Sequence, residues 1–455
     1  MNSIIAILGL GNCDFFTNFC IKPKPYAMLI EFSVGNYRSF KEQVTFSMVA
    51  ANLVSRDKRL DESNVFAVDD DLTLLKSAAI YGANASGKSN LAKALEFMKS
   101  FMVNSSKDTQ STDEINVEPF RLSTDTENKS SYFELVFFMD GRKYRYGFEA
   151  TRERVVSEWL FYVPKIRETK LFERKLSSIK TSKNYDADGI QQRTRNNALF
   201  LSVSAQFNVE LAEKILEWVT DKLNIISGLH DQAYLNYTIN CLINNENKSD
   251  ILQLIKKLDL SIDEIKVQQE DLAIDALPDY MPDEFKKLIV RAAGGKATSI
   301  GTVHKKFDEN GNYKSIEQFD LNNHESDGTC KVFALAGPIV TAIKKREVLV
   351  IDELDARLHP LISRAIVELF NSNKTNPNNA QLIFMTHDTN LLSNNIFRRD
   401  QIWFTEKNRY GATDLYSLAE YKIRNDASFE SDYIKGKYGA IPYIGNLNHL
   451  LDSHA

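Results

Sequence analysis

The chain has 455 residues, of which 43% are hydrophobic and 26% charged, a composition typical of a globular protein with two or three domains. Its formal net charge of −5 excludes a broad electrostatic attraction to nucleic acid or to an anionic membrane. The four cysteines form no C-x-x-C pair and match no zinc-site spacing, so we expect neither zinc nor a disulfide framework and place the chain in the reducing cytoplasm.

Residues 1–27 are expected to be an N-terminal extension. The apolar run at 3–10 is too short to span a bilayer, and no basic region precedes it as in a signal peptide. Met28 opens an alternating run that looks like the start of a domain. No other stretch approaches membrane length, so we expect no contact with a membrane.

A phosphate-binding motif follows. Residues 80–89 read IYGANASGKS and fit the pattern G-x-x-x-x-G-K-[ST]. A buried strand is predicted over 74–81 and a helix over 90–102, which is the context that this motif requires. Backbone groups of the loop cradle phosphates, the lysine neutralises their charge, and the serine hydroxyl binds Mg²⁺. The sequence therefore predicts ATP and Mg²⁺ as cofactors, bound by Asn84, Ala85, Ser86, Gly87, Lys88, Ser89 and Asn90.

Antiparallel strands are predicted next. Asp140-Gly141 between the runs 132–139 and 142–150 is typical of a two-residue hairpin turn. Further β-rich runs at 155–163 and 168–175 extend this pattern into a β subdomain beside the nucleotide site.

The apolar period changes to that of helices from about 207 to 260, so residues 201–300 are predicted to form a mostly helical insertion. The heptads of a coiled-coil arm are missing from it. Asn310-Gly311 then predicts a second hairpin between 302–307 and 313–319.

Two buried strands carry polar residues at their ends. The run 348–353 (VLVIDE) places Asp352 to bind Mg²⁺ with Ser89, and Glu353 to activate the attacking water as general base. The run 381–387 ends in His387, which we interpret as a sensor of the γ-phosphate or of the attacking water. The alternative is that these side chains only cap buried strands.

Between these parts lies a Ser-x-Gly turn. Ser326 and Gly328 precede a helix-like run, CKVFALAGPIVTAIKK, which Gly337-Pro338 is expected to interrupt. A turn at a helix N-terminus is a second candidate anion site. The plainer interpretation of Ser326 is a helix N-cap.

The order of these motifs resembles the ABC-type ATPases of the Rad50/SMC/RecF/OLD group. The segment 36–40 (NYRSF) looks like that group's N-terminal element, which implies nucleotide contacts for Arg38 and Ser39. Residues 325–405 resemble in more detail the RloA-like ATPases of bacterial abortive-infection loci. The resemblance implies a homodimer or higher oligomer in which Ser326 and Gly328 contact the γ-phosphate bound to the opposite subunit. His359 stands where the group's D-loop has an aspartate.

The predicted fold class is α/β: a P-loop ABC-type ATPase core with a mixed sheet, an antiparallel β subdomain and a mostly helical insertion. Four parts are expected: an N-terminal extension at 1–27, an N-terminal ATPase lobe at 28–200, the insertion at 201–300 and a C-terminal ATPase lobe at 301–455. Lys88, Glu353 and His387 are the predicted catalytic residues, and Ser89 and Asp352 the predicted metal ligands.

Three functions share such a core. The favoured one is a cytoplasmic ATPase of an anti-phage system that senses infection and controls a separately encoded effector, expected to be a nuclease. The alternative is a DNA-repair clamp of the RecF/SMC type. The third, a transporter motor, is the weakest. The insert between Lys88 and Ser326 is long, and the Ser-x-Gly turn reads Ser-Asp-Gly-Thr rather than the Ser-Gly-Gly-Gln of transporters. The favoured function allows contact with DNA but does not require it. The tail after His387 lacks an acidic metal pair, so a nuclease is not expected within this chain.

Overall fold

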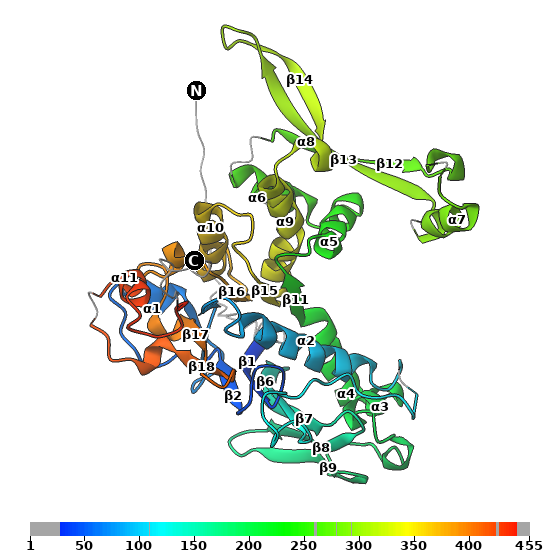
Figure 1. Ribbon diagram of the computed structural model, residues 1–455, viewed down its shortest axis with the longest axis vertical. Coiled ribbons are helices and arrows are strands. Elements are labelled where there is room, and N and C mark those ends of the chain that lie inside the picture. Colours follow the sequence, from blue (N-terminus) through cyan, green and yellow to red (C-terminus); the bar gives the residue numbers. More distant parts are fainter. Residues whose placement is uncertain are drawn as a thin grey trace, which may run out of the picture.

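The computed structural model describes residues 28–108, 110–258, 262–278, 280–292, 294–424 and 427–443. The predicted N-terminal extension, 1–27, lies outside these ranges. Two large sheets and several helix layers make up the described chain (Figure 1), so the predicted α/β class and its mixed sheet are confirmed.

The core sheet has six strands in the order β11-β15-β16-β5-β17-β18. The first five run parallel, and β18 pairs antiparallel with β17. Near-continuous hydrophobic runs form its centre because both faces are covered. The strands are β5 Ser77–Tyr81, β11 Leu223–Ser227, β15 Val348–Asp352, β16 Gln381–Met385, β17 Ile402–Lys407 and β18 Thr413–Ser417.

The second sheet has seven antiparallel strands in the order β10-β9-β8-β7-β6-β1-β2. Its predicted hairpin is confirmed: Asp140 and Gly141 both have positive φ, as a two-residue hairpin turn requires. The strands are β1 Met28–Gly35, β2 Val44–Ser47, β6 Ser131–Met139, β7 Arg142–Ala150, β8 Val155–Val163, β9 Thr169–Lys175 and β10 Ser178–Thr181.

Helices cover both faces of the core sheet (Figure 1). On one face, α2 (Lys88–Asn104), α3 (Phe200–Gln206) and α4 (Glu210–Lys222) share one hydrophobic core with the seven-stranded sheet. On the other face, α9 (Asp327–Lys345) and α10 (Pro360–Asn371) pack in a second core. The core sheet is thus held between two apolar layers, with the phosphate-binding loop at the junction of β5 and α2.

The region predicted as a mostly helical insertion holds α5 (Gln232–Ile243), α6 (Lys248–Lys257) and α7 (Asp283–Ala292). It also holds β11, which is an edge strand of the core sheet. Sequence periodicity missed this strand because it has five residues and begins directly where α4 ends, at the extended Leu223. The proposed domain boundaries stay a prediction.

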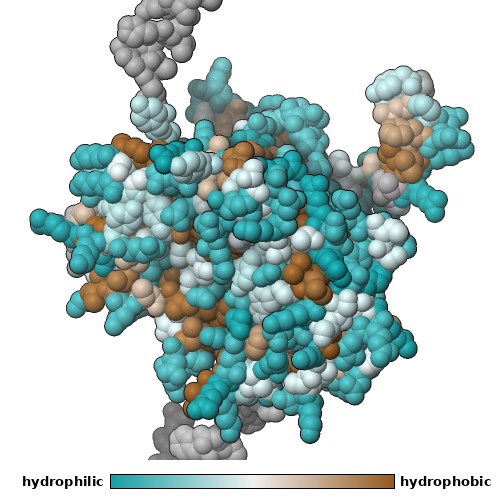
Figure 2. All heavy atoms as spheres, turned by 60° about the horizontal axis from the view of Figure 1, so that its bottom comes forward, coloured by the Kyte–Doolittle hydropathy of each residue, from teal (hydrophilic) through white to brown (hydrophobic). Residues whose placement is uncertain are grey.

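An arm projects from the body. It consists of β12 (Glu264–Asp271), β13 (Lys296–Phe307) and β14 (Tyr313–Asp320), which form a separate three-stranded sheet, and it carries α7 (Figure 1). The antiparallel pairing of β13 with β14 confirms the second predicted hairpin. Figure 2 shows a largely hydrophilic face on the body, with hydrophobic residues in small separate groups. Within the described ranges, no helix combines the length and the apolar character needed to cross a bilayer.

The prediction that Gly337-Pro338 interrupts the second-half helix was wrong, because α9 runs through both residues. Proline lacks the N–H that would bond the carbonyl of Ala334. The Thr238 hydroxyl of α5 replaces it, donating to Ala334 O at 2.7 Å and accepting from the Gly337 N–H at 3.1 Å. A side chain from a neighbouring helix therefore satisfies the backbone groups around the proline.

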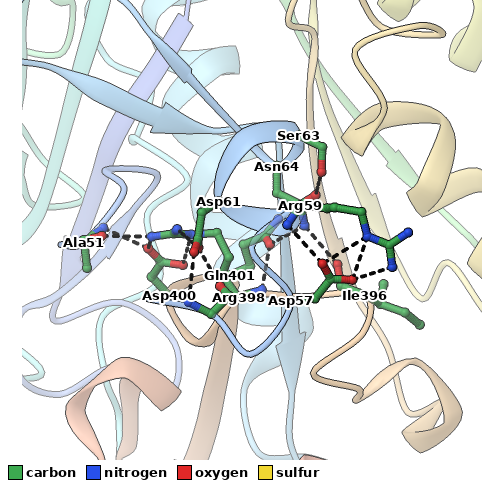
Figure 3. Close-up of polar contacts among 11 residues, drawn as sticks. Ala51, Asp57, Arg59, Asp61, Ser63, Asn64, Ile396, Arg398, Asp400 and Gln401 are labelled. Carbon is green, nitrogen blue, oxygen red and sulfur yellow. Dashed lines mark hydrogen bonds and ion pairs between the residues drawn. The ribbon is translucent and has the colours of Figure 1, made fainter. Parts of the chain in front are cut away.

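Arg398 ties the N-terminal segment to the C-terminal one (Figure 3). Its side chain is 4% exposed, and its guanidinium pairs with Asp400 and Asp61 and donates to Ala51 O at 2.8 Å. Gln401 beside it donates to Ser77 O at 3.0 Å and so fixes the start of β5.

The remaining elements are short, and η denotes a 3-10 helix. They are α1 Leu60–Ser63, β3 Val65–Ala67, β4 Thr73–Leu75, η1 Gln191–Arg193, η2 Ile274–Ala276, α8 Leu321–His324, η3 Thr389–Leu391, η4 Arg399–Gln401, η5 Leu418–Glu420 and α11 Phe429–Ile434.

Candidate active site

The predicted phosphate-binding loop joins the end of β5 to the start of α2. Lys88 is buried, and its ammonium donates to Gly82 O at 2.7 Å and to Ala83 O at 3.1 Å. Burial lowers the pKa of Lys88 to about 8, against the opposing effect of nearby carboxylates. Asn84 and Ala85 are exposed at the tip of the loop. An ammonium that rests on loop carbonyls can transfer to phosphate oxygens with little loss of hydrogen bonding.

An oxygen pair suited to a hard cation lies at the start of α2. The Ser89 hydroxyl donates to Asp352 Oδ1 at 3.1 Å, which joins α2 to the end of β15. Burial raises the pKa of Asp352, while the Ser89 hydrogen bond and the cations Lys93 and Lys88 lower it. Among the described residues, no group of three or more His, Cys, Asp or Glu side chains is arranged to hold a metal. A hydroxyl and one carboxylate suit Mg²⁺, which takes its other ligands from phosphates and water.

Glu353 and His387 lie beside this pair. Glu353 follows Asp352 directly, is half-buried and has a positive φ of 59°. The backbone N–H of His387, at the end of β16, faces the carboxylate of Asp355 at 3.4 Å. Partial burial lowers the pKa of His387, and nearby Lys88 lowers it further. The imidazole is therefore held toward its neutral form, which can accept a hydrogen bond at neutral pH.

The N-terminal element reaches the loop through Ser39. Its hydroxyl accepts from Asn90 Nδ2 at 2.8 Å, and its carbonyl accepts from the Thr413 N–H at 2.7 Å. Arg38 instead donates to Glu118 Oε1 at 2.8 Å and lines a cavity of about 560 Å³ with Tyr37 and Lys93. The structure thus joins Ser39 and Asn90 to the loop and pairs Arg38 with a carboxylate next to it.

Sequence reasoning missed two threonines that form hydrogen bonds with the phosphate-binding loop. Thr405 of β17 and Thr413 of β18 are both buried. The Thr405 hydroxyl bonds the Ser86 hydroxyl at 2.7 Å, and the Thr413 hydroxyl donates to Ser86 O at 2.7 Å. Gly87 has a φ of 119°, and a Cβ there would lie 2.4 Å from Thr413 Oγ1. The sequence signal for them was the presence of threonines in two strand-like runs near the end of the chain. Threonine is common in strands, so this signal does not single them out.

Ser326 and Gly328 form an exposed turn at the N-terminus of α9. The Ser326 hydroxyl accepts from the Thr329 N–H at 3.1 Å, as an N-cap does. Gly328 lies against Arg357, since a Cβ there would be 3.0 Å from Arg357 O. The N-cap geometry is therefore present, and a role of this turn toward a second subunit stays a prediction. His359 likewise caps a helix, its Nδ1 accepting from Leu361 N–H at 3.2 Å.

Comparison with known proteins gives a family and several distant structures. Similar solved structures include an SMC head domain from Thermotoga maritima (13% identity, 87% of this chain and 99% of that chain covered, TM-score 0.38). Another is an SMC head bound to the C-winged helix domain of ScpA (13%, 86% and 97%, 0.41). A third is the recombination mediator RecF of the RecFOR pathway (14%, 86% and 98%, 0.33). Overlap at this level does not identify a function.

A search of curated proteins finds no match. The family model described as "AAA domain, putative AbiEii toxin, Type IV TA system" matches residues 77–393. The match begins at β5, includes the phosphate-binding loop, the Ser-x-Gly turn and β15, and extends just past η3. It covers well over half of the chain, and the protein therefore belongs to this AAA-domain family.

Proposed function

We propose that the chain binds ATP with Mg²⁺ and hydrolyses it to ADP and phosphate. The observation that carries this proposal is the 3.1 Å contact between the Ser89 hydroxyl and the Asp352 carboxylate, directly beside the buried ammonium of Lys88. Ser89 and Asp352 would hold the metal, which neutralises phosphate charge when it is bound. Lys88 and the backbone of residues 84–90 bind the phosphates.

Glu353 is the proposed general base. It follows the metal-binding Asp352 at the end of β15, where a carboxylate can accept a proton from a water on the γ-phosphate side. His387, held toward neutrality next to Lys88, accepts or donates a hydrogen bond to that water or to the γ-phosphate. Ser39 and Asn90 brace the loop, and Arg38 is proposed to contact the nucleotide beyond the phosphates.

The Ser-x-Gly turn is proposed to serve the nucleotide that is bound to a second copy of the chain. Ser326 and Gly328 sit at the start of a 19-residue helix whose N-terminal dipole favours negative charge. Ser326 is exposed, and its hydroxyl bonds only within the turn in the described structure. A homodimer that brings this turn to the partner's γ-phosphate would complete two sites at once.

The proposed output is control of a separately encoded effector in a bacterial anti-phage system. The family description names a toxin–antitoxin system, which supports a partner protein encoded alongside. The arm offers a surface for it, because Tyr280, Phe285 and Leu288 at α7 are 83%, 52% and 61% exposed. We propose a nuclease as the effector. A DNA-repair clamp remains the alternative, and contact with DNA is compatible with either function.

The catalytic proposal is tested with purified variants. Lys88→Ala should weaken ATP binding, because a buried cation at the phosphate site is lost. Glu353→Gln should retain ATP affinity and slow turnover ~10²–10⁴-fold, the usual effect of losing a general base. Glu368→Gln, which alters an exposed glutamate of α10, is the matched control. Turnover of Glu353→Gln at the wild-type rate would show that Glu353 is not the base.

The output is tested in cells and on DNA. Expression of the chain alone should be harmless, and deletion of the neighbouring partner gene should abolish phage protection while ATPase activity stays unchanged. Growth arrest by the chain alone would instead make it the toxin. Duplex DNA should bind weakly, whereas tight binding with a steep salt dependence would favour the repair clamp.

A further inference from the structure

Lys331 is a charged residue in the interior. It lies on α9 just after the Ser-x-Gly turn and is completely buried. Its ammonium donates to Tyr234 OH at 2.8 Å and to the carbonyl of Gly228, and it pairs with Asp231 Oδ1 at 3.4 Å. A buried ammonium is costly, and an apolar side chain of similar volume often serves stability equally well or better. Its placement therefore calls for another explanation.

Two of the partners of Lys331, Gly228 and Asp231, belong to one loop, and Tyr234 lies in the first turn of the helix that follows it. Residues 228–231 connect β11 to α5, and the loop is gripped from two sides. Lys331 holds it from α9, and Arg357, in the loop that follows β15, pairs with the other oxygen of Asp231. Asp231 also accepts from the Tyr234 hydroxyl. The loop is thus held between α9 and the segment that follows β15.

The same loop touches the backbone of Asp352 and Glu353, the two acidic residues at the end of β15. The Gly228 N–H donates to Asp352 O at 2.5 Å. A Cβ on Gly228 would lie 1.9 Å from Glu353 O, so only glycine fits this contact. Glu353 and Arg357 have φ values of 59° and 63°, a left-handed conformation that non-glycine residues keep only when their surroundings enforce it. At Glu353 these surroundings include the Gly228 hydrogen bond to the preceding carbonyl and the close packing of Gly228 against Glu353 O.

We propose that Lys331 is a positioning residue for the proposed ATP hydrolysis: through Gly228 it fixes the backbone of Asp352 and Glu353 and links their placement to the Ser326 turn on the same helix. The inference rests on the proposed function for its kinetic consequence. Its structural consequence, an ordered backbone around Glu353, can be measured without turnover.

The kinetic test compares Lys331→Met with Lys344→Met, which removes an exposed lysine from the same helix. Lys331→Met should lower kcat ~10–10²-fold, the scale of a misplacement of about 1 Å, with ATP affinity and KM within about twofold of wild type. In a Glu353→Gln background it should cause little further loss, because both changes act on the same group. A kcat within about twofold of wild type, or fully additive losses, would overturn the proposal.

The structural test uses backbone hydrogen–deuterium exchange. Lys331→Met should speed exchange in residues 224–231 and 349–357 and leave α2 unchanged, and Lys344→Met should change neither. Arg357→Gln, a milder change at the exposed end of the same cluster, should give a smaller effect in the same peptides and covers a folding failure of Lys331→Met. Unchanged exchange in both variants would sink the inference. If the wild-type protein shows no turnover while the variants change exchange as expected, the proposed ATP hydrolysis is refuted and the positioning role of Lys331 stands.

Discussion

The phosphate-binding loop and the Ser-x-Gly turn are both candidate anion sites at helix N-termini, yet the chain treats them differently. The base of the loop is enclosed: Ser86 and Gly87 are buried against Thr405, Thr413 and Ser39, while Asn84 and Ala85 at its tip are exposed. The turn is open, with Ser326 exposed and bonded only to Thr329 in the described structure. The loop is braced by other parts of its own chain. The turn is bonded only within itself in the described structure, and its role toward a second subunit is a proposal.

The largest expected effect is the loss of ATP turnover when the exposed Ser-x-Gly turn is blocked. Ser326→Arg should abolish turnover, because a long side chain blocks the contact with the opposite γ-phosphate. Mixing it with inactive Lys88→Ala protein should restore about a quarter of wild-type activity, since half of the dimers then contain one intact site of two. ATPase assays of the single variants and the mixture measure this.

Ser428→Arg is the matched control, since Ser428 is also an exposed N-cap serine, at α11. It should leave turnover unchanged. Full activity of a strictly monomeric protein, or a mixture that stays inactive, would show that the turn does not serve a second subunit.

A smaller effect, on ATP binding, is expected from Thr413, which is hydrogen-bonded to the phosphate-binding loop. Thr413→Val removes the hydrogen bond to Ser86 O and should weaken ATP binding about fivefold, the effect of roughly 1 kcal/mol for one buried hydrogen bond. Thr375→Val removes an exposed hydroxyl bond to a main-chain carbonyl, to Leu369 O at 2.6 Å just beyond the end of α10, and should not alter affinity. Titration with a fluorescent ATP analogue distinguishes them. Equal affinities would mean that the loop holds its shape without Thr413.

The smallest effect is a dependence on pH. The pKa of Lys88 is lowered to about 8 by burial, so raising the pH through this value removes its charge. Because the charged form binds phosphate, ATP affinity should fall about twofold between about pH 7 and about pH 8. Lys88→Ala should lack this step. A wild-type affinity that rises over this range would contradict the assignment of the charge to Lys88.

Much of the fold and of the site followed from local patterns. The phosphate-binding loop, the two hairpins and the buried strands that lead to Asp352 and His387 each depend on a few adjacent residues, so a single sequence predicts them. The contact of Ser89 with Asp352 could be expected because both motifs belong to one kind of nucleotide site. The catalytic roles of these residues stay predictions.

What could not be predicted depends on residues far apart in the chain. Pro338 reads as a helix breaker until Thr238, a hundred positions earlier, is seen to satisfy Ala334 O. The five residues of β11 carry no turn or period of their own. Thr405 and Thr413 gain their importance only from lying under the loop. In each case the deciding partner comes from another element.

The strand order of the core sheet has a consequence for how the protein is made. β5, which carries the phosphate-binding loop, lies between β16 and β17, so both of its neighbours come from the last fifth of the chain. A ribosome releases the loop early but its neighbours late. Contacts of such long sequence separation form slowly. The nascent loop therefore lacks both neighbouring strands until β16 and β17 have been synthesised, and nucleotide cannot assist folding before then.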